Sequence, residues 1–157
     1  MRTEEELPVW WPFPRPIFTF LIIDPSGVPI LEYPPPSSNA DVSKTVLVSG
    51  LLTAVNNFAK EIGAGDINDM TFGSYLVTIS KGPNDTLCVL LCDTSYIKDN
   101  KEAANIHVEL KSLTFSRIPN IYKIDYIDGT KDKLLRETFE PYYKLKVKQY
   151  KERFKNL

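Results

Sequence analysis

Two short apolar segments, residues 17–23 and 28–33, predict a pair of β-strands. Residues 24–27 between them read Asp-Pro-Ser-Gly, the composition of a tight turn, because proline presets the second turn position and glycine accepts a positive φ. Pro29 lacks the N–H that a neighbouring strand would need, so the second strand is predicted at the edge of a sheet. The pattern therefore predicts a hairpin with one outer strand.

A long helix is predicted over residues 42–62, ended by Gly63 and Gly65. Its apolar residues recur at spacings of three and four, which predicts one broad stripe that packs on the sheet. The stripe consists of Leu47, Leu51, Ala54, Val55, Phe58 and Ile62, widened by Val48, Leu52 and Ala59.

Three further strands are predicted over residues 66–72, 75–80 and 87–92. Apolar and polar residues alternate over 75–80, as in a strand with one buried face. Residues 82–85 read Gly-Pro-Asn-Asp and predict a hairpin turn. The continuous apolar run at 87–92 predicts a central strand, whereas the polar residues that begin 66–72 predict an edge strand.

Two helices are predicted in the last third of the chain. The first covers residues 99–118, with Asp99 as its cap and a capping box completed by Glu102, although the segment also has the pattern of a strand. The second covers 131–155, where apolar residues recur every three or four positions. These residues are Leu135, Phe139, Tyr143, Val147, Tyr150 and Phe154, and we expect Tyr143 and Tyr150 in the core.

Residues 1–16 form a separate proline-rich and tryptophan-rich arm before a domain that spans 17–157. Four prolines in this arm exclude helix and favour an extended chain. Because exposed tryptophan is unfavourable, Trp10, Trp11 and Phe13 are expected to contact either this domain's own surface or a partner.

The second candidate contact is the basic end of the last helix. This end contains six basic residues and one acidic residue. The candidate contact residues among them are Lys144, Lys146, Lys148 and Lys151. A solvated helix face that compensates the helix dipole explains such a run. Contact with anionic lipid or with an acidic partner is the alternative.

Length and charge narrow the function classes. A chain of 157 residues is long enough for one domain with a core, and a net charge of −1 argues against a nucleic-acid partner. No apolar run reaches the roughly 18 residues of a membrane span, and the acidic, proline-rich start does not resemble a secretory signal. We therefore expect a cytoplasmic protein that is at most peripheral at membranes.

The sequence contains no clear catalytic or metal-binding set. Cys88 and Cys92 are four apart on one predicted strand, about 13 Å, which is too far for a disulfide, so two small buried hydrophobes are expected. His107, the one histidine, is expected on a helix face or in solvent; a pairing with Ser112 or Ser116 is the minor alternative. No phosphate-binding P-loop is present. The prediction is a protein that is not an enzyme and holds neither metal nor cofactor.

The order of the predicted elements, β-β-α-β-β-β-α-α on one antiparallel sheet, predicts an α+β fold. At this level the chain resembles the longin and roadblock group of profilin-like domains, and longin more closely. The segments that carry the resemblance are FLIIDPSGVPILEY, LVSGLLTAVNNFAKEIG, FGSYLVTISKG and LCVLLCD. The resemblance implies a five-stranded sheet with strand order 2-1-5-4-3, whose free edge can accept a strand from a second chain.

The resemblance also implies a non-catalytic interaction platform that binds or regulates a small Ras-like GTPase and forms homodimers or heterodimers. Ile67, Asn68 and Asp69, on the predicted free edge, join the arm as candidate partner contacts. One alternative is a trafficking subunit, such as an adaptor small chain or a tether component, in a larger complex near membranes. A second alternative is a small-molecule sensor with a pocket between helix and sheet.

Overall fold

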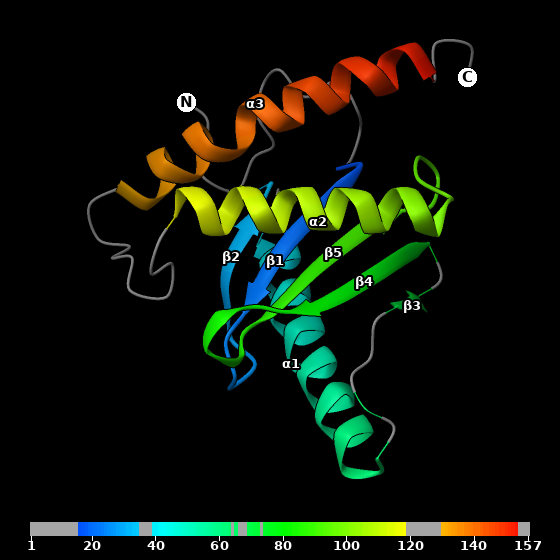
Figure 1. Cartoon of the computed structure of the whole chain (residues 1–157), viewed down its shortest axis with the longest axis vertical. Helices are drawn as coiled ribbons and strands as arrows, with labels where there is room; N and C mark the ends of the chain where they lie inside the picture. Colours follow the sequence, from blue (N-terminus) through cyan, green and yellow to red (C-terminus); the bar gives the residue numbers. More distant parts are fainter. Residues whose placement is uncertain are drawn as a thin grey trace.

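The computed structural model describes residues 16–34, 39–63, 65, 69–72, 74–118 and 130–153. In this part of the chain one antiparallel sheet lies between helices on both faces, as Figure 1 shows, which confirms the predicted α+β class. The strands are β1 (Phe18–Ile23), β2 (Pro29–Tyr33), β3 (Asp69–Phe72), β4 (Tyr75–Lys81) and β5 (Leu87–Asp93). The helices are α1 (Asn39–Glu61), α2 (Asn100–Arg117) and α3 (Thr130–Arg153), with a short 3-10 turn at Pro83–Asp85.

The strands pair in the order β2-β1-β5-β4-β3. The most apolar strands, β1 and β5, occupy the middle and pair directly, with Phe20 opposite Leu90. Strand β2 lies at one edge, as Pro29 predicted, and the pairing shifts register where Ile23 meets Pro29. Hydrophobic runs thus take the positions where both faces of a strand are covered.

The element boundaries differ from the predicted ones in several places. Helix α1 begins at Asn39 rather than at residue 42. Of the predicted strand 66–72, residues Asp69–Phe72 are described as β3, and Ile67 and Asn68 lie outside the described residues. Segment 100–117 is a helix, not a strand, and Asp99 caps it by accepting a 2.8 Å hydrogen bond from the Lys101 amide on Oδ1.

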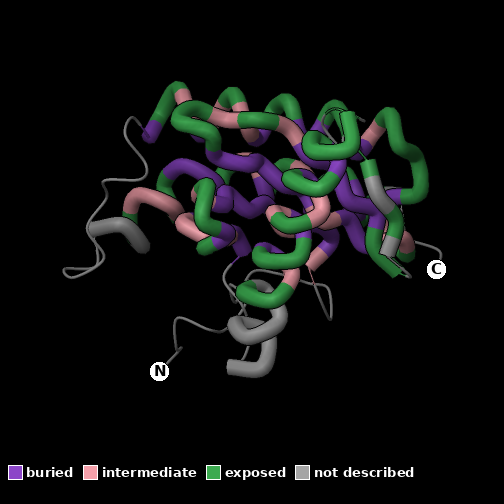
Figure 2. The backbone as a smooth tube through the Cα atoms, turned by 90° about the horizontal axis from the view of Figure 1, so that it is seen from below, coloured by how far each residue is buried: buried purple, intermediate pink, exposed green. Residues whose placement is uncertain are grey.

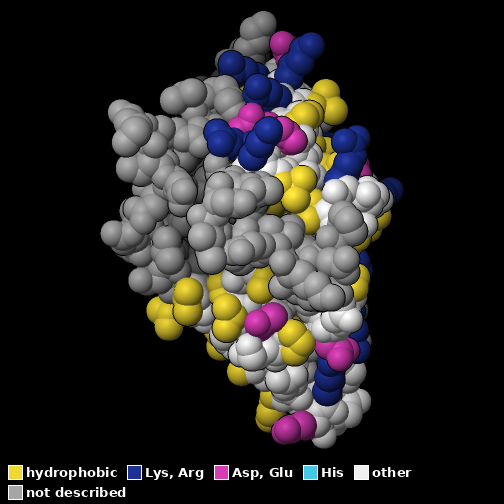
Figure 3. Space-filling view, turned by 90° about the vertical axis from the view of Figure 1, so that its left-hand side faces the viewer, with side chains coloured by type: hydrophobic (Ala, Val, Ile, Leu, Met, Phe, Trp, Pro, Cys, Tyr) yellow, Lys and Arg dark blue, Asp and Glu magenta, His cyan; other side chains and the backbone are white. Residues whose placement is uncertain are grey.

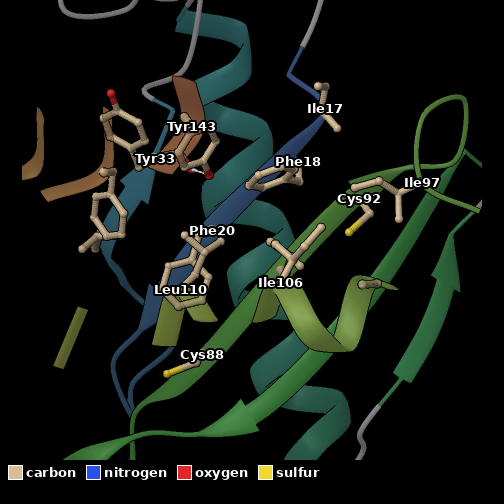
Figure 4. Close-up of a cluster of buried hydrophobic side chains, with 14 of the residues drawn as sticks. Ile17, Phe18, Phe20, Tyr33, Cys88, Cys92, Ile97, Ile106, Leu110 and Tyr143 are labelled. Carbon is tan, nitrogen blue, oxygen red and sulfur yellow. Dashed lines mark hydrogen bonds between the residues drawn. The ribbon is translucent and has the colours of Figure 1, made fainter. Parts of the chain in front are cut away.

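The larger core lies between the sheet and the pair α2 and α3. Figure 4 shows the side chains of Phe18, Phe20 and Tyr143 gathered there, with the chain in front of them cut away and α1 behind the strands. Tyr143 and Tyr150 are buried, as predicted. Cys88 and Cys92 are free and fully buried, and burial raises the pKa of their thiols to about 11 and about 12.

A smaller core lies on the opposite face of the sheet, under α1. It gathers residues of β1, β4 and β5, such as Leu21, Val77 and Val89, around a single fully buried leucine of the helix, Leu52. Figure 2 shows the contrast between the buried strands and the exposed outer turns of the helices. One helix therefore covers this face of the sheet, and it does so with few large side chains.

Candidate interaction surface

The side of α1 that faces the sheet is built from small and polar residues. Ser49, Asn56 and Ala59 are buried there together with Leu52. Ser49 is fully buried, and its Oγ has no hydrogen-bond partner among the described residues. Because an unpaired buried hydroxyl is unfavourable, this side of the helix is not the one best suited to burial.

The opposite side of α1 carries large apolar side chains in solvent. Leu47, Leu51, Phe58 and Ile62 are 73%, 50%, 60% and 62% exposed. With the exposed Ala54 they form one line along the helix, which we call the α1 stripe. Figure 3 shows hydrophobic side chains along the lower half of the molecule, where α1 lies.

The expectation that this stripe packs on the sheet was therefore wrong. Of the predicted set, Leu52 and Val48, which only widened the stripe, pack in the core under the sheet, and Ala59 is buried. The central members are exposed, except for the half-buried Val55. The turn between β1 and β2 lies close to α1. Gly27 has a φ of 94°, and a Cβ built on it would lie 3.7 Å from the Gly50 Cα and 3.6 Å from the Thr53 Oγ1.

A second feature of the sequence indicates that the stripe can remain exposed. From Val46 to Ala59 the helix has no charged residue, and its apolar residues cover an arc wider than one narrow stripe. A helix with so wide an apolar arc can contact more than one neighbour. The α1 stripe is therefore a candidate second interface.

The free edge of the sheet is the second part of the candidate surface. Strand β3 pairs with β4 on one side, with Asp69 opposite Thr78 and Thr71 opposite Leu76. It is the last strand in the order, and Asp69 and Thr71 are exposed. An edge strand offers backbone N–H and C=O groups to another chain. Of the predicted edge contacts, Asp69 is placed here, while Ile67, Asn68 and the arm residues Trp10, Trp11 and Phe13 lie outside the described residues.

His107 lies on a helix face, as predicted, but it is buried rather than in solvent. Its Nδ1 is 2.6 Å from the Thr78 Oγ1 and its Nε2 is 2.7 Å from the Ser80 Oγ, so the imidazole joins α2 to β4. Burial, assisted by the nearby Lys111 charge, lowers the pKa of His107 to about 4 and keeps the ring neutral.

This geometry does not build a nucleophile, base and acid set at His107. Hydroxyls take both ring nitrogens, so no carboxylate orients the imidazole as a catalytic acid would. Neither predicted serine is its partner: Ser112 is exposed, and the Ser116 hydroxyl donates to the Leu113 carbonyl. Elsewhere in the described residues, no three histidine, cysteine or acidic side chains gather in a way that would hold a metal ion.

A small polar hollow lies between α1 and the two hairpin turns. Lys60, Lys81, Asp24 and Asp85 are among the residues that line it, and its volume is about 110 Å³. Ligand pockets usually measure roughly 300–1,000 Å³. The hollow therefore gives little support to a sensor of drug-sized molecules.

The predicted lysines of α3 divide into two groups. Lys144, Lys148 and Lys151 are exposed and follow one line of the helix, whereas Lys146 is half-buried, with its Nζ 5.4 Å from the centre of the Tyr142 ring. None of the described helices is long and apolar enough to cross a membrane.

Comparisons with known proteins leave the family unassigned. No family model and no curated protein matches the chain. Thirteen chains of solved structures match, among them a structure of MglB in a tetrameric arrangement. That match has 18% sequence identity and a TM-score of 0.42, and covers 64% of this chain and 75% of the MglB chain. Similarity at this level carries no conclusion about function.

Proposed function

We propose that the chain is a non-catalytic interaction platform of the longin and roadblock type. It pairs with a second subunit through α1, and it binds or regulates a small Ras-like GTPase. The observation that carries the proposal is the α1 stripe. Leu47, Leu51 and Phe58 are at least half exposed on the same line of one helix. Contiguous apolar surface of this kind marks protein contact sites in soluble proteins.

The geometry of the stripe suits another helix. Residues 47, 51, 54 and 58 are spaced by four, three and four, which is the a and d pattern of a coiled-coil seam. From Leu47 to Ile62 the stripe extends about 22 Å at 1.5 Å per residue. No charged residue lies between Val46 and Ala59, so over this part of the stripe two copies of α1 can approach without repulsion between like charges.

The GTPase part of the proposal rests on the order of the elements. The chain places two strands before α1, three strands after it and two helices last, with β1 and β5 in the middle of the sheet. This order is the one expected from the resemblance to longin domains. His107, which hydroxyls hold on both sides, and the small size of the hollow beside α1 are consistent with a role that is not catalytic.

The pairing is tested by replacing an apolar residue of the stripe with a charge. In sedimentation experiments between about 1 and 100 µM, the wild-type chain should associate and Phe58→Asp should stay monomeric. Val108→Asp is the matched control, because Val108 is 66% exposed but lies on α2, across the sheet. A wild-type chain that is monomeric throughout, or a Phe58→Asp chain that still associates, would contradict a homodimer through α1.

The GTPase partner needs a separate test, so that the two parts can fail independently. The chain is titrated by calorimetry with a panel of Ras-like GTPases, each loaded with GDP or with a non-hydrolysable GTP analogue. We expect binding that distinguishes the two nucleotide states, or a changed rate of GTP hydrolysis. Absence of both, in a chain that associates through α1, would leave a platform whose partners are not GTPases.

A further inference from the structure

The outward face of α3 is fixed by the residues that it buries. Phe139, Tyr143 and Tyr150 anchor the helix on the larger core, and Tyr150 Oη donates a 2.6 Å hydrogen bond to Glu102 Oε1 on α2. The flank of the helix beside this buried side presents Lys144, Lys148 and Lys151 to solvent. We call these three residues the α3 lysine row. Figure 3 shows basic side chains along the upper part of the molecule, where α3 lies.

The three charges of the row act together on an outside anion. Their spacing of four and three residues places them within about 10 Å along the helix. This length is close to the Debye length of roughly 8–10 Å at ordinary salt concentrations, so one anionic surface is attracted by all three. Between Pro141 and Glu152 the one acidic residue is Glu152 itself.

The first half of α3 differs from the second half. There Lys133 lies 3.9 Å from Glu137, one turn along the helix, so its charge is partly compensated within α3. Arg136 and Glu140 add one charge of each sign. The formal charge is zero over residues 130–140, with three basic and three acidic residues, and +4 over residues 141–153, with five basic residues and one acid. The positive charge of the helix is therefore concentrated in its C-terminal half, where it also suits the negative end of the helix dipole.

The composition of the row suits an anionic lipid surface better than it suits the recognition of individual carboxylate groups on a protein. Lysine is a hydrated point charge, whereas recognition of individual carboxylates favours the planar fork of arginine, and the row contains lysine alone. Leu145 is 53% exposed beside the row. The apolar face of α3 is buried in the protein core, so Leu145 is the apolar side chain beside the row that is free to contact the lipid headgroups while the lysines attract the anionic surface.

We propose that the α3 lysine row docks the protein on an anionic lipid bilayer, with Leu145 at the headgroup level. The proposal does not depend on the α1 stripe. Helix α3 covers the face of the sheet opposite α1, so both surfaces are accessible at the same time (Figure 1). A platform held in this way would present α1 away from the membrane.

Vesicle sedimentation tests the proposal with the full chain. Vesicles of phosphatidylcholine with about 30% phosphatidylserine should bind the wild-type protein at about 0.1 M salt, and vesicles of phosphatidylcholine alone should not. Each lysine contributes roughly a fivefold gain near an anionic surface. The triple change Lys144→Gln, Lys148→Gln and Lys151→Gln should therefore lower the partition coefficient roughly a hundredfold.

The matched control removes three positive charges elsewhere on α2 and α3. These are Arg117 at the end of α2 and Lys133 and Arg136 in the first half of α3, and all three are exposed. It should keep most of the binding, and circular dichroism should give the same helix content for both triple variants. Equal losses in the two variants would reduce the effect to net charge and overturn the proposal. Wild-type protein that does not bind the anionic vesicles would also overturn the proposal. If such protein were retained on immobilised polyglutamate, the row would be assigned to an acidic protein partner instead.

Discussion

The Tyr143 hydroxyl donates a 2.8 Å hydrogen bond to the carbonyl oxygen of Tyr33, across 110 residues of chain. This bond fastens α3 to β2, the strand at one edge of the sheet. The two rings also meet edge to face, with centroids 5.1 Å apart, and burial raises the pKa of the Tyr143 hydroxyl, so that it remains a donor. The contact thus joins the last helix to the first hairpin inside the larger core.

Replacing Tyr143 with phenylalanine should destabilise the fold without changing its shape. The buried Tyr33 carbonyl loses this donor while the ring packing is kept, so the free energy of unfolding should fall by about 1–2 kcal/mol. Urea denaturation measures the change, and the m-value should not move. Tyr75→Phe is the control, because Tyr75 is 44% exposed, and it should change stability by less than about 0.5 kcal/mol. Equal effects of the two variants would mean that the hydrogen bond contributes nothing.

Acidification should weaken the fold through His107. Its pKa is lowered from 6.5 to about 4 in the folded chain. Between these values the unfolded chain binds the proton and the folded chain does not, so the free energy of unfolding falls as the pH falls. The stabilisation is complete above about pH 6.5 and is lost towards pH 4, with a total of roughly 3 kcal/mol.

The contribution of His107 is isolated by difference. Urea denaturation of the wild type and of His107→Gln, which does not titrate, should give a stability gap that narrows steadily from pH 6.5 to pH 4. Carboxylates titrate in both proteins and cancel. A gap that does not depend on pH, or an imidazole that titrates near 6.5 by NMR, would contradict the buried position between Thr78 and Ser80.

Two neighbouring leucines report the rotation of α1. Leu52 is fully buried and Leu51 is 50% exposed. Leu52→Ala should therefore lower the free energy of unfolding by about 2–4 kcal/mol, and Leu51→Ala by less than about 1 kcal/mol. The measurement is made at a low micromolar concentration, where association does not add to stability. If Leu51→Ala lowered the free energy of unfolding more than Leu52→Ala, the α1 stripe would face the sheet, and the proposed pairing would lose its basis.

Two glycines should respond to alanine in opposite directions. A Cβ on Gly82 would lie 2.5 Å from the Thr86 Oγ1, 3.0 Å from the Cys88 Sγ and 3.2 Å from the Phe115 Cζ, so Gly82→Ala should destabilise by about 1–3 kcal/mol. A Cβ on Gly50 meets no described atom within 4 Å. Gly50→Ala should then stabilise α1 by about 0.5–1 kcal/mol. Thermal unfolding distinguishes the two signs, and a stabilised Gly82→Ala would refute the tight turn after β4.

The sequence by itself determined the elements, because those depend on local chemistry. Alternation and apolar runs located the strands, Pro29 marked an edge, Asp99 marked the start of α2, and the spacing of Tyr143 and Tyr150 marked the buried side of α3. Each of these signals acts within a few residues, through turn conformation, capping or side-chain periodicity.

Only the tertiary structure decided which way α1 faces and what surrounds His107. Helical spacing identifies an apolar stripe but does not say whether the sheet or another molecule covers it. The observed rotation of α1 packs Leu52 with strand residues that are distant in sequence, such as Leu21 and Val89. Likewise, Thr78 and Ser80 meet His107 from a strand 29 and 27 residues away. Such contacts form when separate elements pack together, and no local pattern encodes them.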